Sequence, residues 1–178
     1  MSKTNNFVFK ALHIVAWVIF VGLCIEAGAL LVNFIFSLFK PEFVHNLYQK
    51  LDLSIMYDRN KWAFFSIYGF ILVISILKAV LFYVVIRLLS KINLAKPFND
   101  FVSRQISIMS YYTLSIGLLS YIARQTAISL QDQGFVIDTL NQYWVDSQAF
   151  ILMAAVIYVI ASIFSKGVEI QNENELTV

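Results

Sequence analysis

The sequence predicts an all-α integral membrane protein: a four-helix bundle with two membrane-surface outer loops and a short cytoplasmic tail. Of its 178 residues, 60% are apolar and 13% are charged, whereas soluble proteins have roughly 45–50% apolar and about 25% charged residues. This small number of polar residues cannot cover the surface of a water-soluble domain. Lipid must therefore cover much of the surface. The apolar runs do not alternate as barrel strands do, which favours helices. We expect one transmembrane domain over residues 1–178.

The first predicted span covers residues 11–39 and is interrupted only by Glu26 and Asn33. A helix of this length measures about 44 Å, so it must tilt or project from a bilayer whose hydrocarbon is about 30 Å thick. Two lysines precede the run, and the small residues at 27–29 resemble a signal-peptide cleavage site. Apolar sequence continues beyond that site, which favours an uncleaved signal-anchor helix over a cleaved signal.

Three further spans follow, at residues 62–86, 106–123 and 147–165, each near the length that crosses the hydrocarbon. The remaining residues, 166–178, are predicted to form the tail. An even number of spans places both termini on one side of the membrane. That side carries Lys3, Lys10, Arg87, Lys91, Lys96, Arg104 and Lys166, and the other carries Lys40, Lys50, Arg59, Lys61 and Arg124. The larger basic group lies in short segments next to the spans, so both termini are predicted to be cytoplasmic.

The two outer connections, residues 40–61 and 124–146, are longer than plain turns. Pro41 can begin a helix whose apolar stripe lies along the membrane surface. That stripe comprises Phe43, Val44, Leu47, Tyr48 and Leu51. The second connection carries Phe135, Val136, Ile137, Tyr143 and Trp144. These residues suit either an aromatic belt at the headgroups or a cap folded onto the first loop that binds a ligand, and the belt is favoured.

Glu26 and Lys78 are the charged residues within the spans. Burying a charge near the bilayer centre costs at least about 2.5–3.5 kcal/mol on insertion scales, so each needs compensation. Taking the midpoint of each span as the membrane centre separates the two residues by about 7 Å along the membrane normal, a gap that two extended side chains can cover. One interpretation is an ion relay or polar ligand site. The other, which is favoured, is a buried pair, or a neutral Glu26 hydrogen-bonded to a neighbouring helix, that fixes packing.

The third span carries a stripe of small and polar residues at helical spacing, comprising Ser103, Ser107, Ser110, Gly117 and Arg124. Small residues let helix backbones approach in a membrane, so this stripe is predicted to face the bundle rather than line a pore. Arg124 is expected to reach the outer headgroups.

Several chemistries lack the residues they need. Cys24 is the sole cysteine, and His13 and His45 have no acidic or cysteine neighbours at ligand spacing. We therefore expect no metal site and no cofactor. A serine or cysteine nucleophile would have no base in reach, so no enzyme activity is expected. With no glycine-rich phosphate loop and no basic stripe, direct nucleic-acid binding is not expected either.

The inner loop and the tail carry recognisable segments, Asn93-Leu94-Ala95-Lys96-Pro97-Phe98 and Phe164 to Val178. With four spans, they resemble the bacterial membrane family catalogued as domain of unknown function 2975. Its ending has the form Gly-x-x-[Ile/Leu]-Gln-x-Glu-x-[Asp/Glu]-Leu-Thr-Val, and Glu175 stands where aspartate is common. The resemblance implies a bacterial inner-membrane location and, through neighbouring genes, a helix-turn-helix regulator as a partner.

The same two segments offer a cytoplasmic surface. Pro97 disfavours a continuous helix, and Asn99 or Asp100 can cap the helix that follows. The predicted partner-binding residues are Lys96, Pro97, Phe98, Gly167, Glu169, Gln171, Glu173, Glu175, Leu176 and Val178. The acidic tail suits docking on a basic partner. It suits equally well docking on the corner that the inner loop of the same chain forms at Lys96 and Pro97. The leading hypothesis is a non-enzymatic protein that lies in membrane lipid and binds a regulator or a membrane complex. Nothing in the sequence excludes a homo-oligomer. The alternative is a small transporter or ligand sensor that uses Glu26 and Lys78.

Overall fold

The computed structural model describes residues 3–40, 44, 47, 48, 51–92, 97–144 and 146–176; the side chains of residues 3–6, 138, 175 and 176 are not described. The all-α prediction is confirmed, because the described residues form helices and no strand. The elements are α1 (Lys3–Phe39), α2 (Ser54–Arg59), α3 (Lys61–Lys91), α4 (Asp100–Asp132), the 3-10 helix η3 (Asp138–Tyr143) and α5 (Ser147–Leu176).

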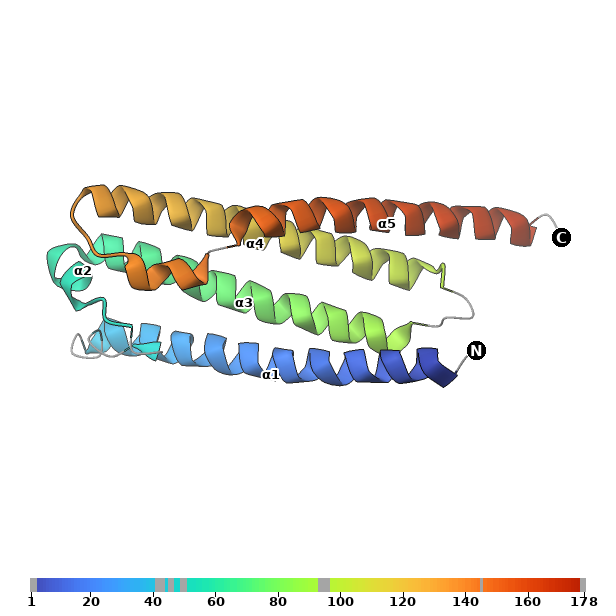
Figure 1. Ribbon diagram of the computed structural model, residues 1–178, viewed down its shortest axis with the longest axis horizontal. Coiled ribbons are helices and arrows are strands. Elements are labelled where there is room, and N and C mark those ends of the chain that lie inside the picture. The colour runs from blue at the N-terminus through green and yellow to red at the C-terminus, as the bar shows by residue number, and fades with distance from the viewer. Residues whose placement is uncertain are drawn as a thin grey trace.

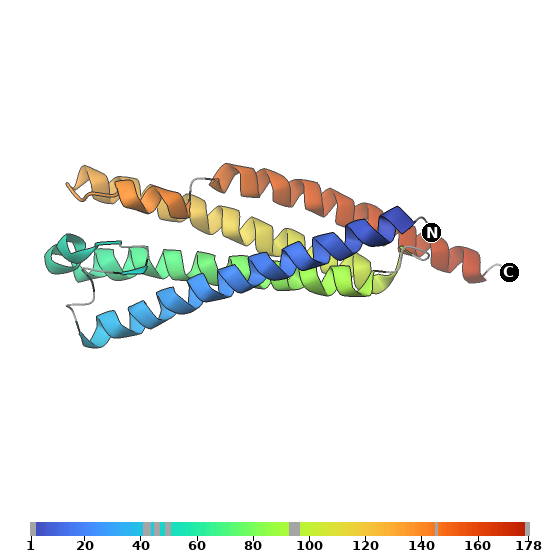
Figure 2. The ribbon, with the colours of Figure 1, turned by 60° about the horizontal axis from the view of Figure 1, so that its bottom comes forward.

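The long helices lie side by side in chain order (Figure 1). Helix α1 packs on α3, α3 packs on α4, and α4 packs on α5. Turned by 60°, the molecule shows α1 crossing the others at an angle (Figure 2). The N- and C-terminal ends lie at the same end of the molecule, as four crossings require (Figure 1).

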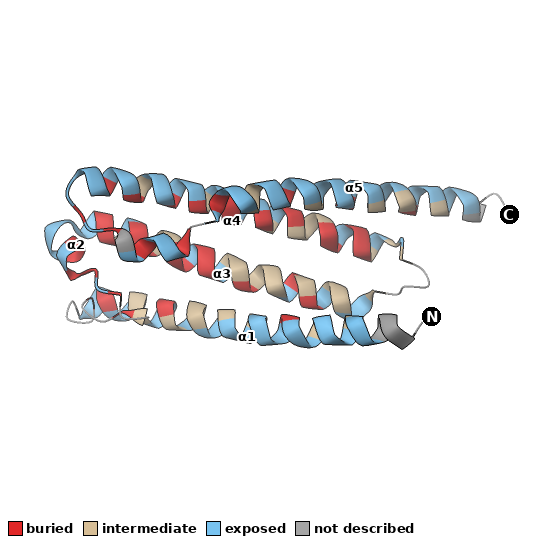
Figure 3. Cartoon of the chain, in the orientation of Figure 1, coloured by how far each residue is buried: buried red, intermediate tan, exposed pale blue. Residues whose placement is uncertain are grey.

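All four long helices are long and apolar enough to cross a membrane. Their outward faces are exposed, most extensively on α1 and α5 (Figure 3). Those faces carry large apolar side chains such as Val18 on α1 and Leu152 on α5. Apolar surface of this extent is stable only against lipid, so the chain is a multi-pass membrane protein.

Asparagine side chains begin two of the long helices. The Asn60 side chain accepts hydrogen bonds from the backbone N–H groups of Trp62 and Ala63 at the start of α3. The Asn99 side chain accepts one from the N–H of Val102 at 3.0 Å, which confirms the predicted cap of α4. Each bond satisfies a donor that the first helical turn leaves without a partner.

Charged residues locate the hydrocarbon layer on the molecule. Helix α4 has none between Arg104 and Arg124, and α5 has none between Asp146 and Lys166. Each interval is about 19 residues, or about 28 Å, which matches the hydrocarbon thickness. The α1–α3 pair extends beyond this layer at the end where α2 lies, because α1 continues to Phe39 and α3 begins at Lys61. We call this the outer end.

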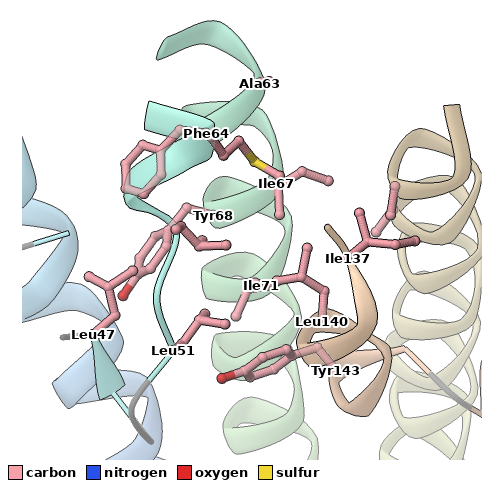
Figure 4. Packing of buried hydrophobic residues seen from close by; sticks show 14 of the residues in the cluster. Leu47, Leu51, Ala63, Phe64, Ile67, Tyr68, Ile71, Ile137, Leu140 and Tyr143 are labelled. Carbon is pink, nitrogen blue, oxygen red and sulfur yellow. The ribbon is translucent and has the colours of Figure 1, made fainter. Parts of the chain in front are cut away.

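The outer end is a packed cap. The described residues of the first connection do not lie along a membrane surface: Val44, Leu47 and Leu51 are buried, and Leu47 forms an isolated antiparallel bridge with Leu51. Pro41 and Phe43, where the surface helix was predicted to begin, lie outside the described residues. The second connection folds back as η3 between α3 and α4, as Leu140 and Tyr143 show (Figure 4).

The predicted aromatic belt is therefore wrong for most of the second connection. Phe135, Ile137, Tyr143 and Trp144 are buried, and only Val136 is largely exposed. Their apolar area is removed from water more completely in this cap than at the headgroups.

The small stripe of α4 faces α5, as predicted. Gly117 is buried where the two backbones are closest: a Cβ atom at this position would lie 2.9 Å from the backbone nitrogen of Ile151. The Ser110 hydroxyl donates to the carbonyl of Ala154 at 3.0 Å. Arg124, in contrast, is exposed at the outer boundary of the layer.

Candidate functional site

Glu26 lies on the half-buried face of α1 that meets α3. Its carboxylate accepts a hydrogen bond from the Ser75 hydroxyl at 3.3 Å. Ser75 is itself 2% exposed. This contact is the inter-helix hydrogen bond that a polar side chain in lipid requires, and it ties α1 to α3, on which α1 packs.

Lys78 lies one helical turn further along α3 but does not form an ion pair with Glu26 in the described part of the chain. Instead, it lines a cavity of about 30 Å³ between α3, α4 and the start of α5. The other lining residues are Ser120, Gln142, Tyr143, Trp144, Asp146, Ser147 and Phe150. The predicted pair therefore has two different sets of contacts: Glu26 accepts a hydrogen bond from Ser75 on α3, and Lys78 lines the polar cavity.

Three residues of the cavity wall have side-chain polar atoms that are shielded from solvent and make no hydrogen bond within the described residues: the Tyr143 hydroxyl, the Trp144 indole Nε1 and the Ser147 hydroxyl. Ser147 is 1% exposed and Trp144 is 2% exposed. A buried polar atom left without a partner costs about 1–3 kcal/mol. The Tyr143 hydroxyl points toward α1 (Figure 4). That leaves Trp144 and Ser147 as the two residues whose unpartnered donors are available to a hydrogen-bond acceptor in the cavity.

The cavity lies near the outer boundary of the hydrocarbon. Ser120 is four residues inside Arg124 on α4, a rise of about 6 Å, and Ser147 is the first residue of α5. The midpoint of residues 62–86 predicted a more central position for Lys78. The difference arises because the outer part of α3 is surrounded by the cap and not by lipid.

A second candidate site lies at the inner end of the bundle. Pro97 and Phe98 precede α4, and the Phe98 ring lies against Gly167, where an added Cβ atom would be 2.5 Å from Cδ1 of the ring. The same ring packs on Phe164 with 5.3 Å between ring centroids. The base of the predicted tail thus docks on the chain's own corner, and Gly167 leaves room for the ring.

Beyond this contact the predicted tail is not a separate segment. Helix α5 continues without a break to Leu176 and projects past the inner ends of the other helices (Figure 1). Val168 is buried, whereas Glu169, Ile170 and Glu173 are exposed, and Gln171 is half-buried. Glu169 accepts an ion-paired hydrogen bond from Lys166 at 2.7 Å. Lys96 and Val178 lie outside the described residues, as do the side chains of Glu175 and Leu176.

Sequence reasoning missed the polar residues that surround Lys78. Ser120 and Ser147 are single hydroxyls in apolar runs, a pattern too common in membrane helices to indicate a site. Trp144 was assigned to an aromatic belt. A detectable signal was its position directly before the charge-free stretch of α5, which placed a hydrogen-bond donor at the edge of the hydrocarbon.

The four long apolar helices define a multi-pass α-helical membrane protein. Residues 41–178 match the family described as a protein of unknown function (DUF2975). The chain belongs to this family, as its inner loop and C-terminal ending predicted. No curated protein and no solved structure matches it significantly.

Proposed function

We propose that this protein is a non-enzymatic accessory protein of the bacterial inner membrane that binds a cytoplasmic regulator or another membrane complex. The contact surface is the inner corner at Phe98 together with the projecting end of α5. In this proposal both termini lie in the cytoplasm, in agreement with the basic residues that flank the inner ends of the helices.

One observation carries the proposal: the end of α5 is an exposed helix held firmly at its base. A free tail of this composition would lose conformational entropy on binding a partner. Here the ring of Phe98 against Gly167 supports the helix. Preorganisation of this kind lowers the cost of association. The glutamates at positions 169, 173 and 175 make the projecting helix acidic, which complements a basic partner.

The experiment is capture of partner proteins from membranes solubilised in mild detergent. A triple variant, E169Q/E173Q/E175Q, removes the acidic charge while keeping side-chain length and helix propensity. We expect it to capture several-fold less partner than the wild type, and we expect capture by the wild type to fall with rising salt. Truncation after Val168 should abolish capture while leaving the Phe98 contact in place.

N172Q is the matched control, because it alters an exposed neutral residue of the same helix. It should capture the same proteins as the wild type. If the wild type, the triple variant and the truncation all capture identical proteins, the end of α5 is not the binding surface and the proposal is wrong.

A second candidate function, a ligand sensor, is favoured by the polar cavity at Lys78. The related idea of a proton-coupled transporter needs Glu26 as a proton carrier, but its carboxylate is already engaged by Ser75. E26Q retains a hydrogen-bond acceptor for Ser75. Unchanged proton-dependent uptake or response in E26Q would therefore exclude the transporter while leaving the sensor open.

A further inference from the structure

The polar cavity lies next to an apolar groove. The groove has a volume of about 360 Å³, in the usual range of ligand pockets, and it shares Asp146 and Phe150 with the cavity wall. Its other lining residues are apolar except Thr113, and they include Leu81, Val85, Met109, Met153 and Ile157. A polar cavity and an apolar groove in contact match a molecule with a small polar head and an apolar chain.

The direction of the groove matches one leaflet of the membrane. From Asp146 at the cavity to Ile157 at the far end, α5 rises about 16 Å, roughly half of the hydrocarbon thickness. On α3 and α4 the groove likewise runs inward, from Leu81 to Val85 and from Thr113 to Met109. A chain in this groove has its head at the outer boundary and its end near the midplane.

The cavity wall determines the chemistry of the head. Lys78 supplies a positive charge. The indole of Trp144 is a hydrogen-bond donor only, and the hydroxyl of Ser147 can also donate. All of these groups favour an anion with several acceptor lone pairs. The cavity is small, with a volume of about 30 Å³, and this favours a compact head such as a carboxylate.

We propose that this site binds a fatty acid of the length of laurate, with its carboxylate in the Lys78 cavity and its chain in the adjoining groove. The proposal names the ligand class of the sensor function, on which it rests. It does not depend on partner binding by α5, because the cavity lies at the opposite end of the membrane layer.

Asp146 provides an internal control. Asp146 lines both the cavity and the groove and is exposed at the outer boundary. A bound carboxylate is therefore repelled by Asp146 and attracted by Lys78. Neutralising the two residues should have opposite effects on the affinity for an anion and little effect on the affinity for a neutral amphiphile.

The test uses the full chain in phosphatidylcholine nanodiscs, with Trp144 as the reporter. The variant W17F/W62F leaves Trp144 as the single tryptophan, because the chain has three. Laurate, dodecanol and acetate are titrated while Trp144 emission is recorded. We expect a saturable change with laurate, and binding at least about tenfold weaker for dodecanol and for acetate, since each lacks one half of the ligand.

In the same background, K78M should weaken laurate binding about tenfold or more, K78R should retain it, and D146N should tighten it. A149F, which places a ring in the groove, should weaken laurate binding but not acetate binding, and it keeps the test valid if K78M does not fold. The chain truncated after Val168 should bind laurate normally. Failure of the partner-binding proposal can therefore be distinguished from failure of the fatty-acid proposal.

Three results would overturn the proposal: equal affinities for laurate and dodecanol, equal affinities for laurate and acetate, or an unchanged Kd in K78M. Absence of any saturable signal with laurate would also overturn it and would indicate that the unpartnered polar atoms of Trp144 and Ser147 are satisfied by water alone. If laurate binds as expected but the protein shows no response in cells, the proposed ligand site is correct and the proposed sensor function is wrong.

Discussion

At the residue scale, glycines show how closely helices approach in this protein. In a bilayer, helices gain little from the hydrophobic effect because lipid is as apolar as their side chains, so close packing decides association. Gly117 sits where a side chain would meet the backbone of α5, whereas Gly69 on α3 has open space around its Cα atom. The same substitution should therefore have opposite effects at the two positions.

We expect G117A to destabilise the protein by about 1–3 kcal/mol, because the methyl group would lie 2.7 Å from Cγ1 of Ile151 and 2.9 Å from its backbone nitrogen. G69A should be neutral or stabilising by up to about 1 kcal/mol, since alanine is the better helix former. The measurement is the temperature at which half of the purified protein loses its monodisperse peak on size-exclusion chromatography. Equal temperatures for both variants would contradict the close contact between α4 and α5.

Tyr68 makes a second residue-scale prediction. Its hydroxyl is fully buried and donates to the carbonyl of Leu30 on α1 at 3.1 Å. Y68F removes this hydrogen bond between α3 and α1 and should cost about 0.5–1.5 kcal/mol. Y83F is the control, because the Tyr83 side chain is exposed on the same helix and retains its ring. The same thermal assay should show a lower midpoint for Y68F alone.

Polar residues could be predicted from sequence only where a single helix carries the information. The stripe of Ser103, Ser110 and Gly117 was assigned to the correct face because helical spacing places those residues together. The hydrogen bond between Ser75 and Glu26 joins two helices, so no spacing rule reveals it. Lys78 was correctly singled out by its cost in lipid, but its surroundings come from three other segments.

At the element scale, the four spans were predicted but their lengths were not. Hydropathy reports only the part of a helix that lies in hydrocarbon. It therefore predicted a span over residues 106–123, whereas the whole helix α4 runs from Asp100 to Asp132. Charged residues beyond the lipid do not end a helix. Likewise α5 continues through Lys166 to Leu176, where a tail was expected. No hydrophobic periodicity in the sequence indicates that η3 packs between the long helices. The reason is that η3 is a short 3-10 segment stabilised by tertiary packing.

The pairing of α4 with α5 can be tested by cross-linking. Ser110 and Ala154 face each other across the interface, so cysteines at both positions, in a C24A background, should form a disulfide on mild oxidation. Cysteines at Ser110 and Val156 should not, because Val156 is exposed on another face of α5. Bridge formation is read from the shift in gel mobility with and without reductant. Equal cross-linking of both pairs would show that α5 rotates or that its register differs.

At the scale of the whole molecule, the structure combines two kinds of packing. Within the hydrocarbon, helices α4 and α5 meet through small residues and hydroxyls. Beyond it, the outer cap resembles the core of a soluble domain: Phe64, Tyr68 and Trp144 are buried with aliphatic residues from five elements. The cap is the part for which water, and not lipid, makes burial favourable. It also covers the Lys78 cavity, so the cavity and the cap depend on one another.

The orientation of this assembly in the membrane gives the last prediction. The cap and the projecting end of α5 lie at opposite ends of the molecule, so only one of them can face the cytoplasm (Figure 1). The excess of basic residues at the inner end predicts that it is the end of α5. Single cysteines at Val136 in the cap and at Asn172 on α5, in a C24A background, report on the two ends because both positions are exposed. A membrane-impermeant maleimide should label V136C on intact spheroplasts and N172C only after permeabilisation. The reverse pattern would place the acidic helix outside the cell, where no cytoplasmic regulator could reach it, and would turn the carboxylate site toward the inner leaflet.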